Sequence, residues 1–122
     1  ACALIEKNKR HFGTPNIRVI RGLAPEALTN LPVPTHAFLG GSAGNLREIM
    51  DCLLQKNPAI RMVINTVTLE TIGEVMDCLK TLPVREEEIL SVNIAKARAL
   101  GAYHLMTGQN PIYIITCQGG KA

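Results

Sequence analysis

The chain has 122 residues, of which 47% are hydrophobic, 19% charged and 3% aromatic, and its formal net charge is +3. This length is typical of one domain or part of one, and the composition is that of a globular protein. The weak charge, without a basic run, does not favour nucleic acid as a partner. No stretch approaches the roughly 20 apolar residues of a membrane-spanning helix and no export signal opens the sequence, so we expect a cytoplasmic protein without membrane contact.

The cysteines and histidines show no spacing typical of a metal site. The four cysteines are scattered without a C-x-x-C pair, and we interpret them as reduced packing residues, with Cys52 and Cys78 inside predicted helices. The three histidines are equally dispersed, so no metal is indicated.

The first third of the chain is predicted to hold a helix, a strand and a short helix. Residues 1–12 place apolar side chains on one helical face, and residues 17–21 alternate and are rich in branched side chains, which predicts a strand. A turn follows at Gly22-Leu23-Ala24, and Pro25 can open a short helix that runs through Leu28.

The next segment, residues 35–45, is the most informative. A short apolar strand around Phe38 and Leu39 ends at glycines, and an amphipathic helix begins at Leu46. Strand, glycine turn and helix in this order build ligand crevices at the carboxyl ends of strands in open α/β sheets, although glycine turns without a ligand are equally common. Asn45 and Glu48 are predicted to cap the helix as a capping-box-like pair.

Alternating helices and strands continue to the end of the chain. The patterns predict helices over 46–54 and 68–82 and strands over 60–65, 88–95 and 111–117, and the apolar run at 60–65 indicates burial on both faces. Thr68 is predicted to cap the second of these helices, whose inner side would carry Leu69, Ile72, Val75, Met76, Leu79 and Leu82. A loop of about fifteen residues is expected between the last two strands, which permits antiparallel pairing. The prediction is an α/β fold with a mostly parallel sheet and an antiparallel strand pair at the end.

Several segments together resemble a known enzyme family. They are residues 37–45 and 63–71, then Ala97-Arg98, Leu100-Gly101 and His104, and finally residues 110–115, with Phe12, Asn16 and Gly22 in matching places. In this order and spacing they resemble the decarboxylating precorrin-6Y methyltransferases (C-5,15-methylating) of cobalamin biosynthesis, and the resemblance covers essentially the whole chain.

The resemblance implies a fold, a reaction and ligands. The fold would be the carboxyl-terminal portion of a Rossmann-like methyltransferase domain. The reaction would be methyl transfer from S-adenosyl-L-methionine to a ring carbon of a precorrin, coupled to decarboxylation of an acetate side chain. The partners would be the tetrapyrrole substrate and further copies of the chain, since family members often form tetramers. Such chemistry asks the protein mainly to position two reactants.

The resemblance also implies the site residues. Gly22, Leu23 and Ala24 would flank the adenine, and Gly40 and Gly41 would contact the cofactor. His104 is the candidate for proton transfer, because histidine side chains exchange protons near neutral pH. The substrate would contact eight residues, which are Ser42, Gly44, Asn65, Thr66, Thr68, Glu70, Arg98 and Asn110; Thr68 can equally be a helix cap alone, and Arg98 would suit a polycarboxylate.

The sequence departs from the family at its start. The strand, Gly-x-Gly-x-Gly turn and acidic second strand that open such methyltransferases are not in these 122 residues, so we expect residues 1–122 to be a single, incomplete methyltransferase domain. Without those strands, residues 17–21 and 37–39 would lie three strand spacings apart, about 14 Å. We expect the two strands to pair directly, or another chain to fill the gap.

Two other functions stay open from the sequence. One is a related methyltransferase with another substrate such as tRNA, which the weak positive charge does not favour. The other is a non-catalytic fragment that associates through strand edges.

Overall fold

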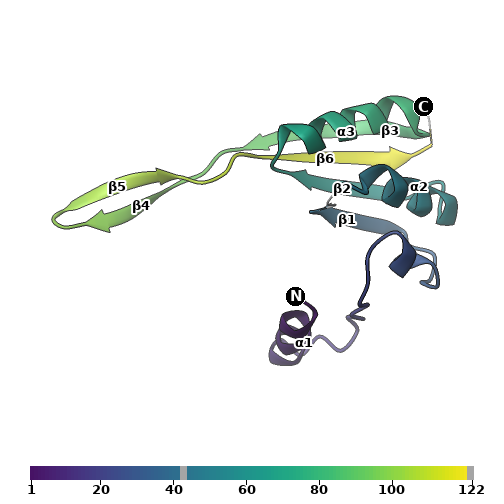
Figure 1. The fold of residues 1–122 in the computed structure, drawn as a ribbon, viewed down its shortest axis with the longest axis horizontal. Helices are drawn as coiled ribbons and strands as arrows, with labels where there is room; N and C mark the ends of the chain where they lie inside the picture. The colour runs from purple at the N-terminus through teal and green to yellow at the C-terminus, as the bar shows by residue number, and fades with distance from the viewer. Residues whose placement is uncertain (42–43, 121–122) are drawn as a thin grey trace. The chain divides into compact units, whose positions relative to one another are not determined.

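The structure is a computed structural model that describes residues 1–41 and 44–120. The chain divides into two compact units, Ala1–Leu31 and Pro32–Ala122, each with its own internal contacts (Figure 1). None of the helices within the described residues combines the length and the apolar character needed to cross a membrane.

The first unit contains two short helices. The α-helix α1 spans Cys2–His11 and the 3-10 helix η1 spans Glu26–Leu28, as the sequence predicts. Within this unit α1 buries no residue, and its large apolar side chains, Leu4 and Ile5, are exposed.

The prediction of a strand at residues 17–21 is wrong. These residues form no strand in the structure, and Ile17 and Ile20 are each 41% exposed. A β-strand is defined by ladder hydrogen bonds to a neighbour, and the ladders of the described residues all lie in the second unit. The expected direct pairing with residues 37–39 is therefore also wrong.

The second unit is built on a four-stranded mixed sheet. Its strands are β1 (His36–Gly40), β2 (Arg61–Thr66), β3 (Val84–Val92) and β6 (Ile112–Gly119), in the order β1-β2-β6-β3. β1 and β2 are parallel, and β6 runs antiparallel to both β2 and β3. The predicted antiparallel final pair is confirmed, but β3 begins at Val84 and ends at Val92 instead of spanning 88–95.

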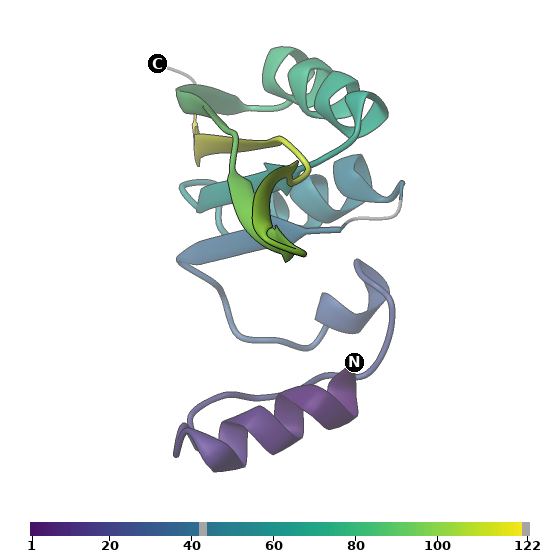
Figure 2. The ribbon, with the colours of Figure 1, turned by 90° about the vertical axis from the view of Figure 1, so that its left-hand side faces the viewer.

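Two helices cover one face of this sheet. Figure 2 shows α2 (Leu46–Lys56) and α3 (Leu69–Thr81) on the same side of the strands. The core lies between them and the sheet, and its fully buried side chains include Leu46, Met50, Ile60, Met62, Ile64, Val75, Cys78, Ile115 and Cys117.

Two burial predictions for this region are wrong. In β2, Met62, Ile64 and Thr66 are buried whereas Val63 and Asn65 are only half-buried, because both helices lie on one face of the sheet. Leu69, predicted on the inner side of α3, is 81% exposed because it is the first residue of the helix and precedes the turns that reach the core.

The helix caps are confirmed for α3 and differ for α2. Thr68 Oγ1 accepts a hydrogen bond from Thr71 N at 3.1 Å, as predicted for a cap. Asn45 is the N-cap residue of α2, but its side chain makes no capping hydrogen bond, since its backbone (φ −103°, ψ 21°) lies outside the extended region that aims a capping side chain. Glu74 of α3 accepts from Arg47 N instead, at 3.4 Å, so one helix supplies an acceptor to the first turn of the other.

The segment predicted as a long loop is a β-hairpin. The strands β4 (Ala95–Leu100) and β5 (Tyr103–Gly108) pair antiparallel around a two-residue turn, and Leu100 faces Tyr103 across it. Every residue of both strands is exposed. The hairpin connects β3 to β6 and projects beyond the sheet (Figure 1).

Candidate functional site

Three strands end and a fourth begins at one edge of the sheet. Gly40, the last residue of β1, is the register partner of Asn65, and Thr66, the last residue of β2, is the partner of Tyr113 in β6. Val92, where β3 ends, pairs with Ile112, where β6 begins. The carboxyl ends of β1, β2 and β3 therefore meet at this edge, where open α/β sheets bind ligands.

Asn65 presents an unsatisfied polar atom at this edge. Its Oδ1 is buried, yet it has no hydrogen-bond partner among the described residues. A buried carbonyl oxygen without a partner costs roughly 1–3 kcal/mol, so proteins seldom keep one without a reason. A ligand that donates a hydrogen bond to Asn65 Oδ1 would remove this cost.

The glycines after β1 leave the backbone beside Asn65 accessible. Gly41 has a φ of 73° and Gly44 a φ of 88°, a backbone region that favours glycine. A Cβ added at either would meet no atom of the described residues within 4 Å. At Gly40 an added Cβ would lie 3.1 Å from the ring of Phe38, which is 68% exposed. The predicted site residue Ser42 lies outside the described residues.

The side chains at the end of β2 and the start of α3 differ in burial and in hydrogen bonding. Thr66 is buried, and its hydroxyl donates to the Tyr113 carbonyl at 3.5 Å. Thr68 is exposed and occupied as the α3 cap, with its Oγ1 also donating to Thr71 Oγ1 at 2.8 Å. Glu70 is exposed in the first turn of α3.

The structure places Arg98 and His104 on opposite faces of the hairpin. Arg98 in β4 pairs with Leu105, whereas His104 in β5 pairs with Ala99. Register partners share a face and neighbouring residues alternate, so the two side chains point to opposite sides. Asn110 is exposed between β5 and β6, where the chain returns to the sheet.

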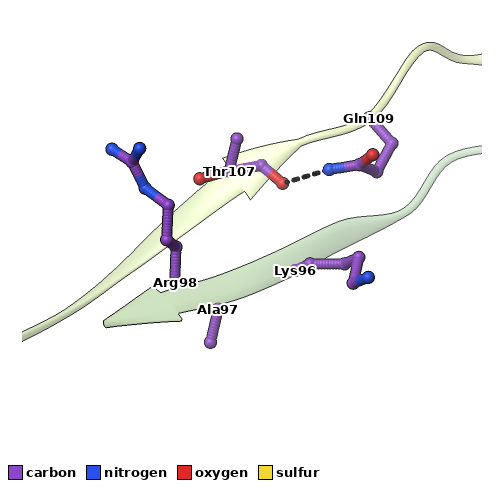
Figure 3. A pocket seen from close by; sticks show the side chains of 5 residues that line it. All are labelled: Lys96, Ala97, Arg98, Thr107 and Gln109. Atoms are coloured by element: carbon purple, nitrogen blue, oxygen red, sulfur yellow. Dashed lines mark hydrogen bonds between the residues drawn. The ribbon is translucent and has the colours of Figure 1, made fainter. Parts of the chain in front are cut away.

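A shallow hollow of about 270 Å³ lies at the base of the hairpin, lined by Lys96, Ala97, Arg98, Thr107 and Gln109 (Figure 3). Only Arg98 of this group was predicted from the sequence. The alternation Lys96-Ala97-Arg98 is the signal that could have indicated a strand with two cations on one face.

The predicted adenine-flanking turn belongs to the first unit. Gly22-Leu23-Ala24 precedes η1, where Leu23 O accepts from Ala27 N at 2.8 Å and the Leu23 side chain is 78% exposed. The same unit has a hollow of about 330 Å³, lined by Lys9, Arg10, Gly13, Thr14 and Pro15.

Two of the four free cysteines are buried and poorly suited to chemistry. Burial raises the pKa of the Cys117 thiol from 9.0 to about 11, with the nearby Cys78 adding to the effect. Burial also raises the pKa of Cys78. The thiolate is the reactive form of cysteine, so both residues are packing groups. Within the described part of the chain, no group of His, Cys, Asp and Glu side chains could hold a metal ion.

Comparison with known proteins places this arrangement in a family. Residues 1–118 match the model of the precorrin methyltransferase domain. A probable cobalt-precorrin-6B C(15)-methyltransferase (decarboxylating) from Methanothermobacter thermautotrophicus is 37% identical over 108 residues, which is 88% of this chain and 56% of that protein. The chain spans about 60% of the length of the curated relatives it matches.

Solved structures agree with this relationship. A precorrin-6Y C5,15-methyltransferase from Geobacter metallireducens superposes with a TM-score of 0.78 at 35% identity, over 93% of this chain and 60% of that one. An S-adenosylmethionine-dependent O-methyltransferase from Thermotoga maritima has a TM-score of 0.62 at 14% identity, over 99% and 46%, and shows the shared Rossmann-like fold alone. The glycine-lined sheet edge thus lies in a Rossmann-like α/β fold, and the chain belongs to the precorrin methyltransferase domain family.

Proposed function

We propose that the protein carrying this chain transfers a methyl group from S-adenosyl-L-methionine to a ring carbon of a precorrin and couples this step to decarboxylation of an acetate side chain in cobalamin biosynthesis. Membership of the family and the names of the relatives support this proposal. The structural observation that carries it is the buried, unpartnered Asn65 Oδ1 beside Gly40, at the sheet edge where three strands end.

The residues at this edge fit the cofactor's need for hydrogen-bonding groups and a close backbone. Gly40 and Gly41 would let the cofactor approach the main chain, because no atom of residues 1–41 and 44–120 lies within 4 Å of a Cβ position at Gly41. Gly22, Leu23 and Ala24 would flank the adenine. When bound, the sulfonium supplies an electrophilic methyl group. We propose that residues 1–122 are one part of the domain that holds it.

The substrate would lie over the same edge and the hairpin. Gly44, Asn65, Glu70, Arg98 and Asn110 are exposed or half-buried there and can contact it, and Ser42 belongs to the same proposal. Thr66 and Thr68 would hold the chain in place beside the substrate. The Thr66 hydroxyl is bonded inside the sheet, and Thr68 caps α3.

His104 is proposed as the residue that moves a proton during the reaction. Its place on an exposed strand leaves the imidazole accessible. A methyl transfer of this kind depends mainly on holding the reactants in line, so the contribution of His104 would be modest beside that of positioning.

We also propose a cytoplasmic homo-oligomer, with a tetramer as the expected form. The end of the hairpin supports an association between copies, because Leu100 is 56% and Tyr103 is 79% exposed and an isolated two-stranded hairpin is only marginally stable in water. The four free thiols agree with a reducing compartment.

The test is transfer of a labelled methyl group. The protein carrying this chain, supplied with tritiated S-adenosylmethionine and a precorrin that retains its acetate side chains, should incorporate label into the tetrapyrrole and release carbon dioxide. Label in tRNA and none in the tetrapyrrole would favour a methyltransferase that acts on tRNA. No transfer to either substrate would reject the proposal. A His104→Gln variant with unchanged turnover would remove the proton-transfer role alone.

A further inference from the structure

The base of the β4–β5 hairpin carries positive charge without any compensating carboxylate. Residues 93–110 contain one lysine and one arginine, Lys96 and Arg98, and no aspartate or glutamate. Among the described residues the one ion pair found joins Arg85 to Glu87 in β3, so neither hairpin cation is paired there. The hairpin therefore carries two unpaired cations, two residues apart on β4.

The strand geometry directs both cations to one face. Lys96 and Arg98 are two residues apart on β4, a spacing at which side chains share a face. Thr107 is the register partner of Lys96 and brings a hydroxyl to the same face. Figure 3 shows the Arg98 and Thr107 side chains reaching out on one side of the hairpin and Ala97 on the other.

The hollow between these side chains is held at its inner end by Gln109. The Gln109 backbone N–H donates to Ile94 O at 2.8 Å, and its Nε2 donates to Thr107 O at 3.4 Å. The first bond extends the pairing of the two strands past Ala95 and Gly108, and the second ties the Gln109 side chain back to β5. The strands that carry the hollow of about 270 Å³ are therefore paired along its whole length.

The hydrogen-bond donors of Lys96, Arg98 and Thr107 favour a carboxylate ligand. Arginine offers a planar fork of donors that matches both oxygens of a carboxylate, lysine offers a point charge with three donors, and threonine adds a hydroxyl donor. A ligand with several carboxylates could engage both cations at once.

The position of the hollow connects it to the sheet edge. The hairpin leaves β3 at Val92 and returns to β6 at Ile112, and these two residues pair at the edge that Asn65 shares. A flat ligand that rests on this edge and extends along the hairpin would bring its acidic side chains to the hollow.

We propose that Lys96, Arg98 and Thr107 form a carboxylate-binding subsite that takes the acidic side chains of a flat polycarboxylate macrocycle. This inference rests on the proposed function and adds Lys96 and Thr107 to the residues that hold the substrate. The subsite sets the orientation of the macrocycle relative to the sheet edge.

The test is binding of uroporphyrin III, a fluorescent octacarboxylate macrocycle, to the protein carrying this chain. We expect saturable quenching for the wild type and about tenfold weaker binding for the K96Q/R98Q double variant, because exposed charge contacts each add a modest amount. The matched control is K7Q/K80Q, which removes the same charge from exposed positions on α1 and α3 and should change the Kd by less than about twofold. Lys96→Arg keeps the charge and should keep the affinity.

Several outcomes would overturn the subsite: no saturable binding by the wild type, unchanged binding by K96Q/R98Q, or equal weakening in both double variants. Benzenehexacarboxylate should displace the porphyrin and phosphate at the same ionic strength should not; displacement by both would mean a general anion site. Circular dichroism of each variant checks that it is folded. Methyl transfer that persists while the subsite test fails would reject the subsite alone, and an intact subsite without methyl transfer would reject the proposed function alone.

Discussion

Replacing Asn65 by leucine should make the protein more stable and less able to bind its tetrapyrrole substrate. Leucine has nearly the shape of asparagine without its polar atoms, and Asn65 Oδ1 is buried without a partner among the described residues. The substitution therefore removes an unsatisfied acceptor instead of breaking a hydrogen bond. Residues that serve a ligand at the expense of the free protein behave in this way.

The size of the gain follows from the burial of the residue. An unsatisfied buried acceptor costs roughly 1–3 kcal/mol, and Asn65 as a whole is only half-buried, so the lower end of that range applies. We expect Asn65→Leu to raise the free energy of unfolding by about 1 kcal/mol, or the Tm by roughly 4–8 °C for a unit of this size. Substrate affinity should fall about tenfold, the value of one lost hydrogen bond.

Urea unfolding followed by circular dichroism measures the stability, and quenching of uroporphyrin III fluorescence measures the affinity for a tetrapyrrole. The matched control is Thr66→Val in the next position of β2. Thr66 is buried and its hydroxyl already donates to Tyr113 O, so this variant should lose about 1 kcal/mol or less and keep its affinity. If Asn65→Leu loses as much stability as Thr66→Val, or binds uroporphyrin III as tightly as the wild type, the reasoning is refuted.

Three further predictions concern stability, each measured by urea unfolding. Gly119→Ala should lose about 1–3 kcal/mol, because an added Cβ would collide with the backbone carbonyl of Pro58; a loss below about 0.5 kcal/mol would mean that this loop moves aside. Since burial raises the pKa of Cys117 from 9.0 to about 11, the folded state keeps a proton that the unfolded state loses, so stability present below pH 9 should fall by up to about 3 kcal/mol between pH 9 and 11. Cys117→Ala should show a shallower slope, because the raised pKa of Cys78 is then the remaining thiol contribution, and an equal slope in both proteins would contradict the assignment. Thr68→Ala should lose about 1 kcal/mol through the missing bond to Thr71 N while Thr68→Ser keeps most of it; equal losses in the two would show that the hydroxyl is not the cap.

The elements with their own hydrophobic period could be predicted from the sequence. The helices α2 and α3 and the strands β1, β2 and β6 lie close to their predicted ranges, because each carries a continuous apolar pattern that the core requires. The Thr68 cap could also be predicted, since it depends only on residues three positions apart.

Features that depend on a partner could not be predicted from local pattern. Residues 17–21 have a strand pattern but no strand beside them, and the acceptor at the start of α2 comes from Glu74, 27 residues away in the chain. The hairpin escaped prediction because alanines at 95, 97 and 99 have low strand propensity, although the alternation and the Gly101 turn were visible.

The candidate site could be predicted in part. The pairing of Gly40 with Asn65 follows from the rule that parallel strands end at one edge, whereas the opposite faces of Arg98 and His104 follow from a hairpin register that the sequence did not reveal. The sequence also cannot indicate that Asn65 Oδ1 is unpartnered, because that depends on every neighbour in the fold.

Backbone amide exchange with and without S-adenosylmethionine tests the central claim most directly. The protein carrying this chain should show slower exchange, or shifted amide resonances, at Gly40, Gly41 and Asn65 when it is saturated with the cofactor, with little change in the buried end of β6 around Cys117. A saturated protein in which those three amides are unaffected would contradict a cofactor site at this edge of the sheet.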